Sequence, residues 1–164
     1  MPSITDRIEK RVLLRASRER VWRAISDSKQ FGKWFGVEFE GPFVAQTRVT
    51  GKIVPTEADA EVAKSQKPHV GLAFEFTIDR IEPMQLFSFR WHPFAVERGV
   101  DYSQEPTTLV VFELEEVAGG TMLTISESGF DRIPLERRAK AFAANDQGWA
   151  AQAELIQKYL APTA

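Results

Sequence analysis

The sequence predicts an α+β domain in which a curved antiparallel β-sheet wraps around one long C-terminal α-helix. Three observations support this fold class: a strand followed directly by two short helices, a series of alternating strands joined by short turns, and a long amphipathic segment at the end of the chain. A sheet with one apolar face must bury that face, and the terminal helix is the only predicted element long enough to cover it. Because a strongly twisted sheet curves more than a straight helix can fill, we expect a cavity between them.

Length and composition limit the functions that the chain can have. Its 164 residues suffice for one sizeable core without a linker-like stretch, so we expect a single domain over residues 1–164. The net charge of −2 provides no basic field, so we expect neither nucleic acid nor a membrane as a partner. With no cysteine and two histidines, thiolate chemistry and cysteine-ligated metals are excluded, and we expect no metal or cofactor. The charged N-terminal segment and the lack of a long apolar run predict a cytoplasmic protein.

The first 36 residues predict one strand and two short helices. Residues 8–16 read as the strand, and Ser17 offers a side-chain oxygen that can cap the helix after it. Either Asp27 or Ser28 can cap the second helix, and Gly36 is placed to end it. The second helix has three aromatic residues on one face: Phe31, Trp34 and Phe35.

The middle of the chain predicts an antiparallel meander. Six segments have strand character: 37–39, 48–54, 70–81, 85–91, 107–116 and 122–128. Gly119 and Gly120 form a hairpin turn between the last two, because glycine tolerates the positive φ that such turns require. Two longer segments, 55–69 and 93–106, are predicted as loops, and loops of this length are often lids or binding loops.

The last segment, residues 134–160, is the longest predicted helix. Eight residues at alternating spacings of four and three form one stripe: Leu135, Ala139, Phe142, Asp146, Trp149, Ala153, Ile156 and Leu160. Asp146 is its one polar member, and an unpaired buried carboxylate costs several kcal/mol. It either binds a ligand or a basic partner, or it reaches solvent because the helix is slightly rotated. Gly148, in mid-helix, indicates either tight packing against the sheet or room for a ligand beside Trp149.

Five segments carry a family resemblance: RVWRAISD (20–27), FGKWFG (31–36), FRWHPF (89–94), TLVVFELEEVAGGTMLTISESGFDRIP (108–134) and NDQGW (145–149). Together they resemble the START-like (SRPBCC) helix-grip superfamily, and within it the bacterial group related to the activator of the heat-shock protein 90 ATPase. The resemblance implies a sheet of six to seven strands gripping the C-terminal helix around a hydrophobic cavity. It implies no single activity, because such relatives include carriers, receptors, polyketide cyclases and co-chaperones.

The candidate ligand-binding residues combine large aromatic side chains with three polar ones. They are Trp34, Phe35, Phe76, Phe89, Trp91, Phe112, Glu127, Asn145, Asp146 and Trp149. For any single aromatic, filling the core is the simpler role. Glu127 shares a strand face with Leu123 and Ile125, so we expect it to point inward. It acts there either as a general acid or base with a raised pKa, or as the structural ion-pair partner of Arg90 or Arg48.

The orientation of the strand before the second loop determines whether His92 can face the cavity and take part in catalysis. Burial favours an inward face of Phe87, Phe89 and Trp91, which places His92 on the outer face as a structural hydrogen-bonding residue. His69, in the first loop, is expected in solvent. Motifs for phosphate binding, serine hydrolysis and zinc hydrolysis are absent, so we assign no catalytic residue.

The sequence therefore predicts a protein that binds a small hydrophobic or amphipathic molecule between its sheet and its terminal helix. One alternative is a cyclase- or hydrolase-type enzyme that uses Glu127 and Asp146 as acid and base, which requires both carboxylates to open into one cavity. The other is a co-chaperone-like interaction module, suggested by the resemblance alone. A homodimer through a sheet edge is compatible with each of them.

Overall fold

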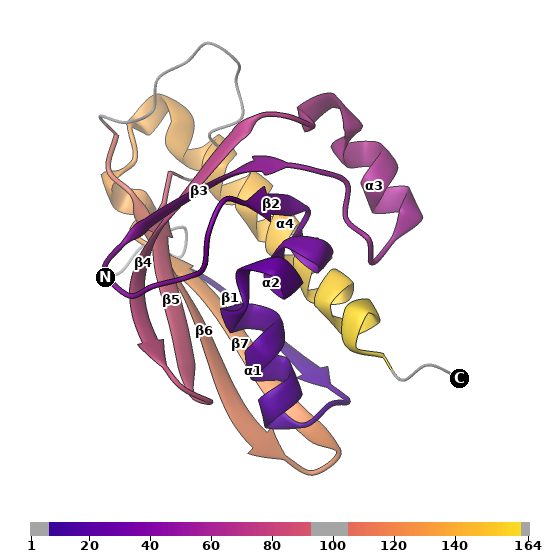
Figure 1. Ribbon diagram of the computed structural model, residues 1–164. Helices are drawn as coiled ribbons and strands as arrows, with labels where there is room; N and C mark the ends of the chain where they lie inside the picture. Colours follow the sequence, from indigo (N-terminus) through magenta and orange to yellow (C-terminus); the bar gives the residue numbers. More distant parts are fainter. Residues whose placement is uncertain (1–6, 93–104, 162–164) are drawn as a thin grey trace.

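The computed structural model describes residues 7–92 and 105–161, in which one antiparallel sheet curves around the C-terminal helix (Figure 1). The elements are β1 (Arg7–Leu14), α1 (Arg18–Ser26), α2 (Ser28–Phe35), β2 (Val37–Phe39), β3 (Arg48–Ile53), α3 (Ala60–Gln66), β4 (Ala73–Glu82), β5 (Leu86–Trp91), β6 (Thr108–Val117), β7 (Gly120–Ser128) and α4 (Leu135–Leu160). The seven strands are ordered β1-β7-β6-β5-β4-β3-β2, and all neighbours are antiparallel. The predicted α+β fold class is confirmed.

The predicted helix boundaries near the N-terminus follow from local hydrogen bonds. Ser17 Oγ accepts a hydrogen bond from the Arg20 backbone nitrogen at 3.2 Å and so caps α1. Of the two candidates for α2, Asp27 is the cap, and its carboxylate accepts from the Lys29 nitrogen at 2.9 Å. Gly36 ends α2 with a φ of 94°, a left-handed conformation that glycine adopts without strain.

Helix α3 lies within the segment predicted as the first long loop. The Asp59 side chain caps it by accepting from the backbone nitrogens of Glu61 and Val62, at 2.8 and 3.2 Å. The helix lies near the C-terminal end of α4 (Figure 1), to which it is joined by an ion pair between Asp59 and Lys158. The loop prediction is therefore wrong for this segment, while nearly all of the second predicted loop, 93–106, lies outside the described residues.

The predicted stripe along α4 is fully buried only in the C-terminal half of the helix. Trp149, Ala153, Ile156 and Leu160 are buried, whereas the Leu135 side chain near the other end is 76% exposed. Spacings of four and three have a period of 3.5 residues, and a straight helix of 3.6 residues per turn drifts from them by about 20° per heptad. Over the two heptads from Trp149 back to Leu135 this amounts to about 40°. The buried face of α4 accordingly moves to Ala141.

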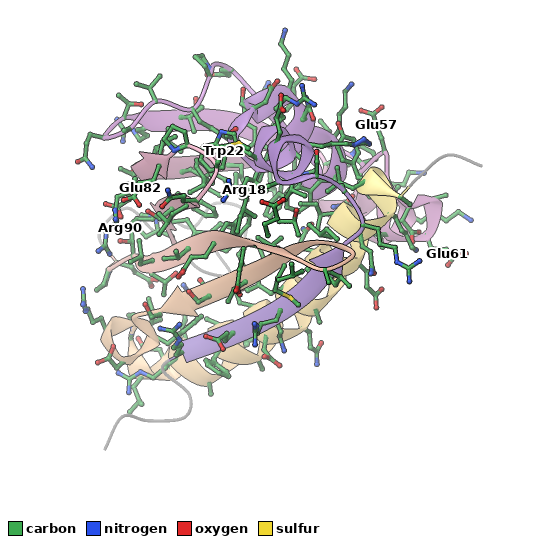
Figure 2. All side chains as sticks on the ribbon, turned by 90° about the horizontal axis from the view of Figure 1, so that it is seen from below. Arg18, Trp22, Glu57, Glu61, Glu82 and Arg90 are labelled. Atoms are coloured by element: carbon green, nitrogen blue, oxygen red, sulfur yellow. The ribbon has the colours of Figure 1, made fainter. Side chains whose placement is uncertain are left out.

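Side chains fill the space between the sheet and the helices (Figure 2), and many of those in the buried core are aromatic. The inward faces of β4 to β6 match the predicted alternation: Phe76, Ile78, Phe87, Phe89, Val110 and Phe112 are fully buried. Phe76 and Phe89 stack with ring centroids 3.7 Å apart, and Phe31 of α2 packs against the same cluster. Within residues 7–92 and 105–161, no helix combines the length and apolar character needed to cross a membrane.

Candidate functional site

Glu127 is a fully buried carboxylate in the middle of the molecule. It lies near the end of β7, and Leu123 and Ile125 before it on the same face are also fully buried. The strand alternation thus turns Glu127 inward, as the sequence predicted. Its position faces β5 and β6 on one side and α4 on the other, so partners from three elements can reach it.

Four side chains donate hydrogen bonds to this carboxylate. Oε1 accepts from Trp149 Nε1 at 2.8 Å and from Asn145 Nδ2 at 3.0 Å. Oε2 accepts from Thr108 Oγ1 at 2.6 Å, from Trp91 Nε1 at 2.7 Å and from the same Asn145 nitrogen at 3.1 Å. Because Trp91 and Thr108 belong to the sheet while Asn145 and Trp149 belong to α4, Glu127 connects the two layers.

The environment of Glu127 opposes and favours its charge at the same time. Burial raises the pKa of the Glu127 carboxyl, and the hydrogen bonds from Thr108, Trp91, Trp149 and Asn145 lower that pKa in opposition. An indole nitrogen can only donate. With one indole at each oxygen, both oxygens must act as acceptors whether the group is ionised or protonated.

The ion pair with arginine that the sequence allowed for Glu127 is not formed. Arg48 lies on an exposed part of β3, with its guanidinium 3.7 Å from Glu75. Arg90 points to the opposite face of β5 from Trp91, and Figure 2 shows it at the periphery of the molecule. Neutral donors take the place of a cation because the inward sheet face around Glu127 carries aromatic and small polar residues.

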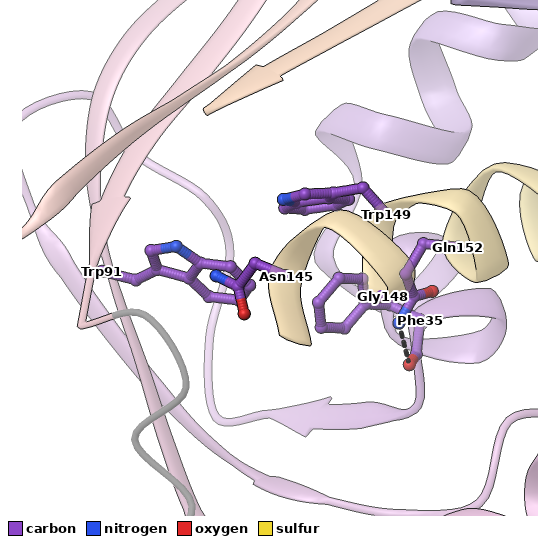
Figure 3. Close-up of a pocket in the computed structure, with 6 residues that line it drawn as sticks. All are labelled: Phe35, Trp91, Asn145, Gly148, Trp149 and Gln152. Carbon is purple, nitrogen blue, oxygen red and sulfur yellow. Dashed lines mark hydrogen bonds between the residues drawn. The ribbon is translucent and has the colours of Figure 1, made fainter. Parts of the chain in front are cut away.

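A small pocket lies next to this cluster, between α2, β5 and α4 (Figure 3). Six residues line it: Phe35, Trp91, Asn145, Gly148, Trp149 and Gln152. Its volume is about 70 Å³, well below the roughly 300–1,000 Å³ of a drug-sized pocket. At roughly 10–15 Å³ of such volume per water molecule, it admits about five waters or one small group of atoms.

Three of the residues that line the pocket are aromatic and contact one another. The ring centroids of Trp91 and Trp149 are 5.5 Å apart, and those of Phe35 lie 6.3 and 6.1 Å from them, respectively. Since both indole nitrogens donate to Glu127, their N–H edges are directed at the carboxylate. The walls of the pocket are thus mainly ring carbon.

Two side-chain oxygens at the pocket have no donor among the residues that the structure describes. Gln152 Nε2 donates to the Phe35 carbonyl oxygen at 3.4 Å, which leaves its Oε1 buried and without a partner. Because that carbonyl can only accept, the amide cannot be turned the other way. The Asn145 amide is oriented similarly by Glu127, since its nitrogen must face the carboxylate and its Oδ1 is directed away.

Gly148 is in the middle of α4 and has no packing reason to be glycine. A Cβ atom built there would meet no heavy atom within 4 Å. The tight packing that the sequence offered as one explanation is therefore wrong. The alternative, that glycine leaves room beside Trp149, agrees with its position in the pocket lining.

The structure places the predicted site residues in three groups. Four of them line the pocket: Phe35, Trp91, Asn145 and Trp149. Glu127 accepts hydrogen bonds from the last three of these. Three further predicted residues belong to the packed aromatic core: Phe76, Phe89 and Phe112. Gln152 was not predicted, although it follows Trp149 by three residues and therefore shares its helix face.

Two predicted residues lie away from the pocket. Trp34 is buried in the core, where its Nε1 donates to the Ala24 carbonyl oxygen at 2.9 Å. Asp146 is on the side of α4 that faces β1; its side chain is 45% exposed and pairs with Lys10 Nζ at 2.9 Å. The rotation of the helix face explains this position, and neither Asp146 nor Glu127 is among the six residues that line the described pocket.

His92 neither lines the pocket nor hydrogen-bonds to Glu127. Its Nε2 is 3.0 Å from the Glu105 carbonyl oxygen, which agrees with the structural role expected from the sequence. Within the described ranges, no group of three or more histidine, aspartate or glutamate side chains is arranged to hold a metal ion.

A curved antiparallel sheet, a long terminal helix seated in it and a lined pocket at their junction define a helix-grip protein. The chain belongs to the family described as Activator of Hsp90 ATPase homolog 1-like protein, whose family model matches residues 15–161. A comparison with the curated proteins finds none that matches.

Solved structures with the same fold come from several bacteria. A protein from Arthrobacter aurescens is 18% identical with a TM-score of 0.71, covering 95% of this chain and 86% of its own. Protein MLL2253 from Mesorhizobium loti is 17% identical with a TM-score of 0.67, covering 94% of this chain and 96% of its own. The Aha1 dimer from Colwellia psychrerythraea is 18% identical with a TM-score of 0.63, covering 94% and 95%. At these identities the likeness is one of fold.

Proposed function

We propose that the protein binds a small molecule with a hydrophobic or amphipathic group in the pocket between the sheet and α4. The observation that carries this proposal is Gly148. A glycine in a helix interior is less favourable than alanine by about 1 kcal/mol, and here a methyl group would meet nothing. A residue that lowers helix stability without easing any contact is best explained by the space it leaves in the pocket.

The size of the pocket limits how much of a ligand it holds. A volume of about 70 Å³ accommodates a short alkyl chain or a small head group, while any larger part of the ligand extends beyond the six lining residues. Rings of Phe35, Trp91 and Trp149 supply apolar contact, and the carboxamides of Asn145 and Gln152 supply polar orientation. This combination is typical of small-molecule sites.

A fragment screen by saturation-transfer NMR tests the proposal. Short alkyl and small aromatic compounds are screened against the wild type and against Gly148→Ala. We expect hits for the wild type, with their affinity reduced at least about fivefold in the variant because the added methyl occupies pocket space.

Gly41→Ala is the matched control, since Gly41 also has open space around it, has no positive φ and lies outside the pocket. Equal binding by the wild type and Gly148→Ala, or no hits at all with the folded wild type, would contradict the proposal.

A homodimer is a second proposal, about partners. The related Colwellia structure is described as an Aha1 dimer. In the described part of this chain, the edge strands β1 and β2 each pair with one neighbouring strand only, which leaves one side of each open to a second copy. Light scattering during gel filtration tests it: we expect twice the chain mass at micromolar concentration, and a monomer mass throughout would contradict it.

A further inference from the structure

We infer that the pocket recognises its ligand through a single hydrogen-bond donor, a hydroxyl or a neutral N–H group, and that Asn145 Oδ1 is the acceptor. The inference rests on the proposed binding function and names the polar chemistry of the molecule bound there. It follows from the donors and acceptors that the lining side chains offer. Four of the six lining residues carry a polar side-chain atom: Trp91, Asn145, Trp149 and Gln152.

The nitrogen atoms of these four side chains already donate within the protein. Trp91 Nε1 and Trp149 Nε1 donate to Glu127 at 2.7 and 2.8 Å. Asn145 Nδ2 donates to the same carboxylate, at 3.0 and 3.1 Å from its two oxygens. Gln152 Nε2 donates to a backbone carbonyl oxygen of α2 at 3.4 Å. These contacts turn the donors of the lining into the protein and away from a ligand.

The two carboxamide oxygens differ in their access to a ligand. Gln152 Oε1 is buried, which closes it to an incoming molecule, and Figure 3 shows it pointing away from Asn145. Asn145 Oδ1 also has no donor among the residues that the structure describes, but this atom is not buried. Because Glu127 holds the nitrogen of the amide, the oxygen is the polar atom that Asn145 leaves accessible.

One accessible acceptor beside walls of ring carbon matches a ligand with one donor. A hydroxyl or a neutral N–H group satisfies Asn145 Oδ1, whereas an ether or an alkyl chain leaves this oxygen desolvated and unpaired. A carboxylate only accepts hydrogen bonds, so it cannot satisfy the oxygen either. An ammonium brings three donors and a charge to a lining in which no side chain is charged.

Glu127 gives the pocket this polarity. A carboxamide without a fixed partner turns either its oxygen or its nitrogen outward, so it serves donors and acceptors alike. Both oxygens of Glu127 accept hydrogen bonds, so the Asn145 nitrogen has to face them and its oxygen has to face the other way. Glu127 is not part of the lining. It therefore acts through Asn145 as a positioning residue.

The composition of the chain provides a specific probe. It has one asparagine, so labelling with ¹⁵N-asparagine gives a single side-chain amide signal, that of Asn145. Two isomers are titrated into the protein: n-butanol, which donates one hydrogen bond, and methyl propyl ether, which donates none. The indole N–H resonances of Trp91 and Trp149 report occupancy of the pocket. Trp34, bonded to the Ala24 carbonyl oxygen in the core, is the reference.

We expect n-butanol to shift the Asn145 amide and both pocket indoles with a Kd about fivefold below that of the ether, because one hydrogen bond distinguishes the two. Asn145→Leu keeps the approximate size of the side chain and removes the acceptor, so the two Kd values should agree within about twofold. Gln147→Leu makes a similar change at an exposed position of α4 and should keep the preference for the alcohol.

The wild-type comparison decides the inference without any variant. Equal Kd values for the alcohol and the ether refute recognition of a donor, while binding in the pocket stands. A preference that leaves the Asn145 amide signal unmoved, or that persists in folded Asn145→Leu, shows that the acceptor is another atom and refutes the role of Asn145. If neither compound shifts the two indoles, the proposed binding of such small groups in this pocket fails as well.

Discussion

Replacing Glu127 with glutamine tests whether the buried carboxylate organises the site. The change keeps the size of the side chain and converts one oxygen into an amide nitrogen. Each oxygen accepts from an indole, Trp149 at 2.8 Å and Trp91 at 2.7 Å. Because an indole nitrogen only donates, the new NH₂ group faces a donor in either amide orientation.

The expected loss follows from the bonds that this clash removes. A hydrogen bond to a charged acceptor contributes about 1.5–3 kcal/mol, and a buried donor left without an acceptor costs about 1–3 kcal/mol. A neutral amide has a smaller desolvation cost than the buried carboxylate, which offsets part of the loss. We therefore expect Glu127→Gln to lower the free energy of unfolding by about 2–3 kcal/mol.

Urea denaturation followed by circular dichroism measures this loss, and a double-mutant cycle assigns it. Trp149→Phe removes one of the two indole donors. In the Glu127→Gln background its cost should be smaller by about 1.5 kcal/mol, because the donor it removes no longer has an acceptor. Glu113→Gln, on an exposed position of β6, is the control and should stay within about 0.5 kcal/mol of the wild type. Unchanged stability of Glu127→Gln, or strictly additive effects in the cycle, would show that the hydrogen bonds from the indoles to this carboxylate do not stabilise the fold.

Three further predictions use the same unfolding measurement. Gly148→Ala should raise the free energy of unfolding by about 1 kcal/mol, and a decrease would show a contact that the structure lacks. Asp146→Asn should cost less than about 1 kcal/mol, because its ion pair with Lys10 is partly exposed to solvent; a loss of about 3 kcal/mol would place this carboxylate in the core. The raised pKa of Glu127 means that the folded state holds the proton to higher pH than the unfolded state. Its contribution to stability should therefore decline as pH rises from 4.5 to the raised pKa and then level off. Wild type minus Glu127→Gln isolates this slope, and a difference that increases with pH over that interval would contradict it.

Much of the fold could be predicted because its signals are local. The alternation of β4 and β6, the Ser17 and Asp27 caps and the positive φ at Gly36 depend on residues that are close in sequence. The inward orientation of Glu127 and Trp91 followed from the same two-residue period. These predictions need no knowledge of what lies across the core.

The site could be predicted only in part because it depends on how distant elements meet. The sequence indicated that Trp91, Glu127 and Trp149 face the interior, but not that both indole nitrogens reach the same carboxylate. That convergence requires the curvature of the sheet and the rotation of α4, which no local pattern specifies. The same rotation brings Gln152 into the pocket and moves Asp146 out of it. A strict 3.5-residue stripe could not reveal this drift.

A crystal structure of the protein with its best-binding small compound tests directly whether the pocket between the sheet and α4 holds a ligand. We expect density for the compound in the pocket, against the rings of Trp91 and Trp149 and next to Gln152, with the hydrogen bonds of Glu127 preserved. Density for the compound only at another place, or side chains closing the space between α4 and the sheet, would contradict it.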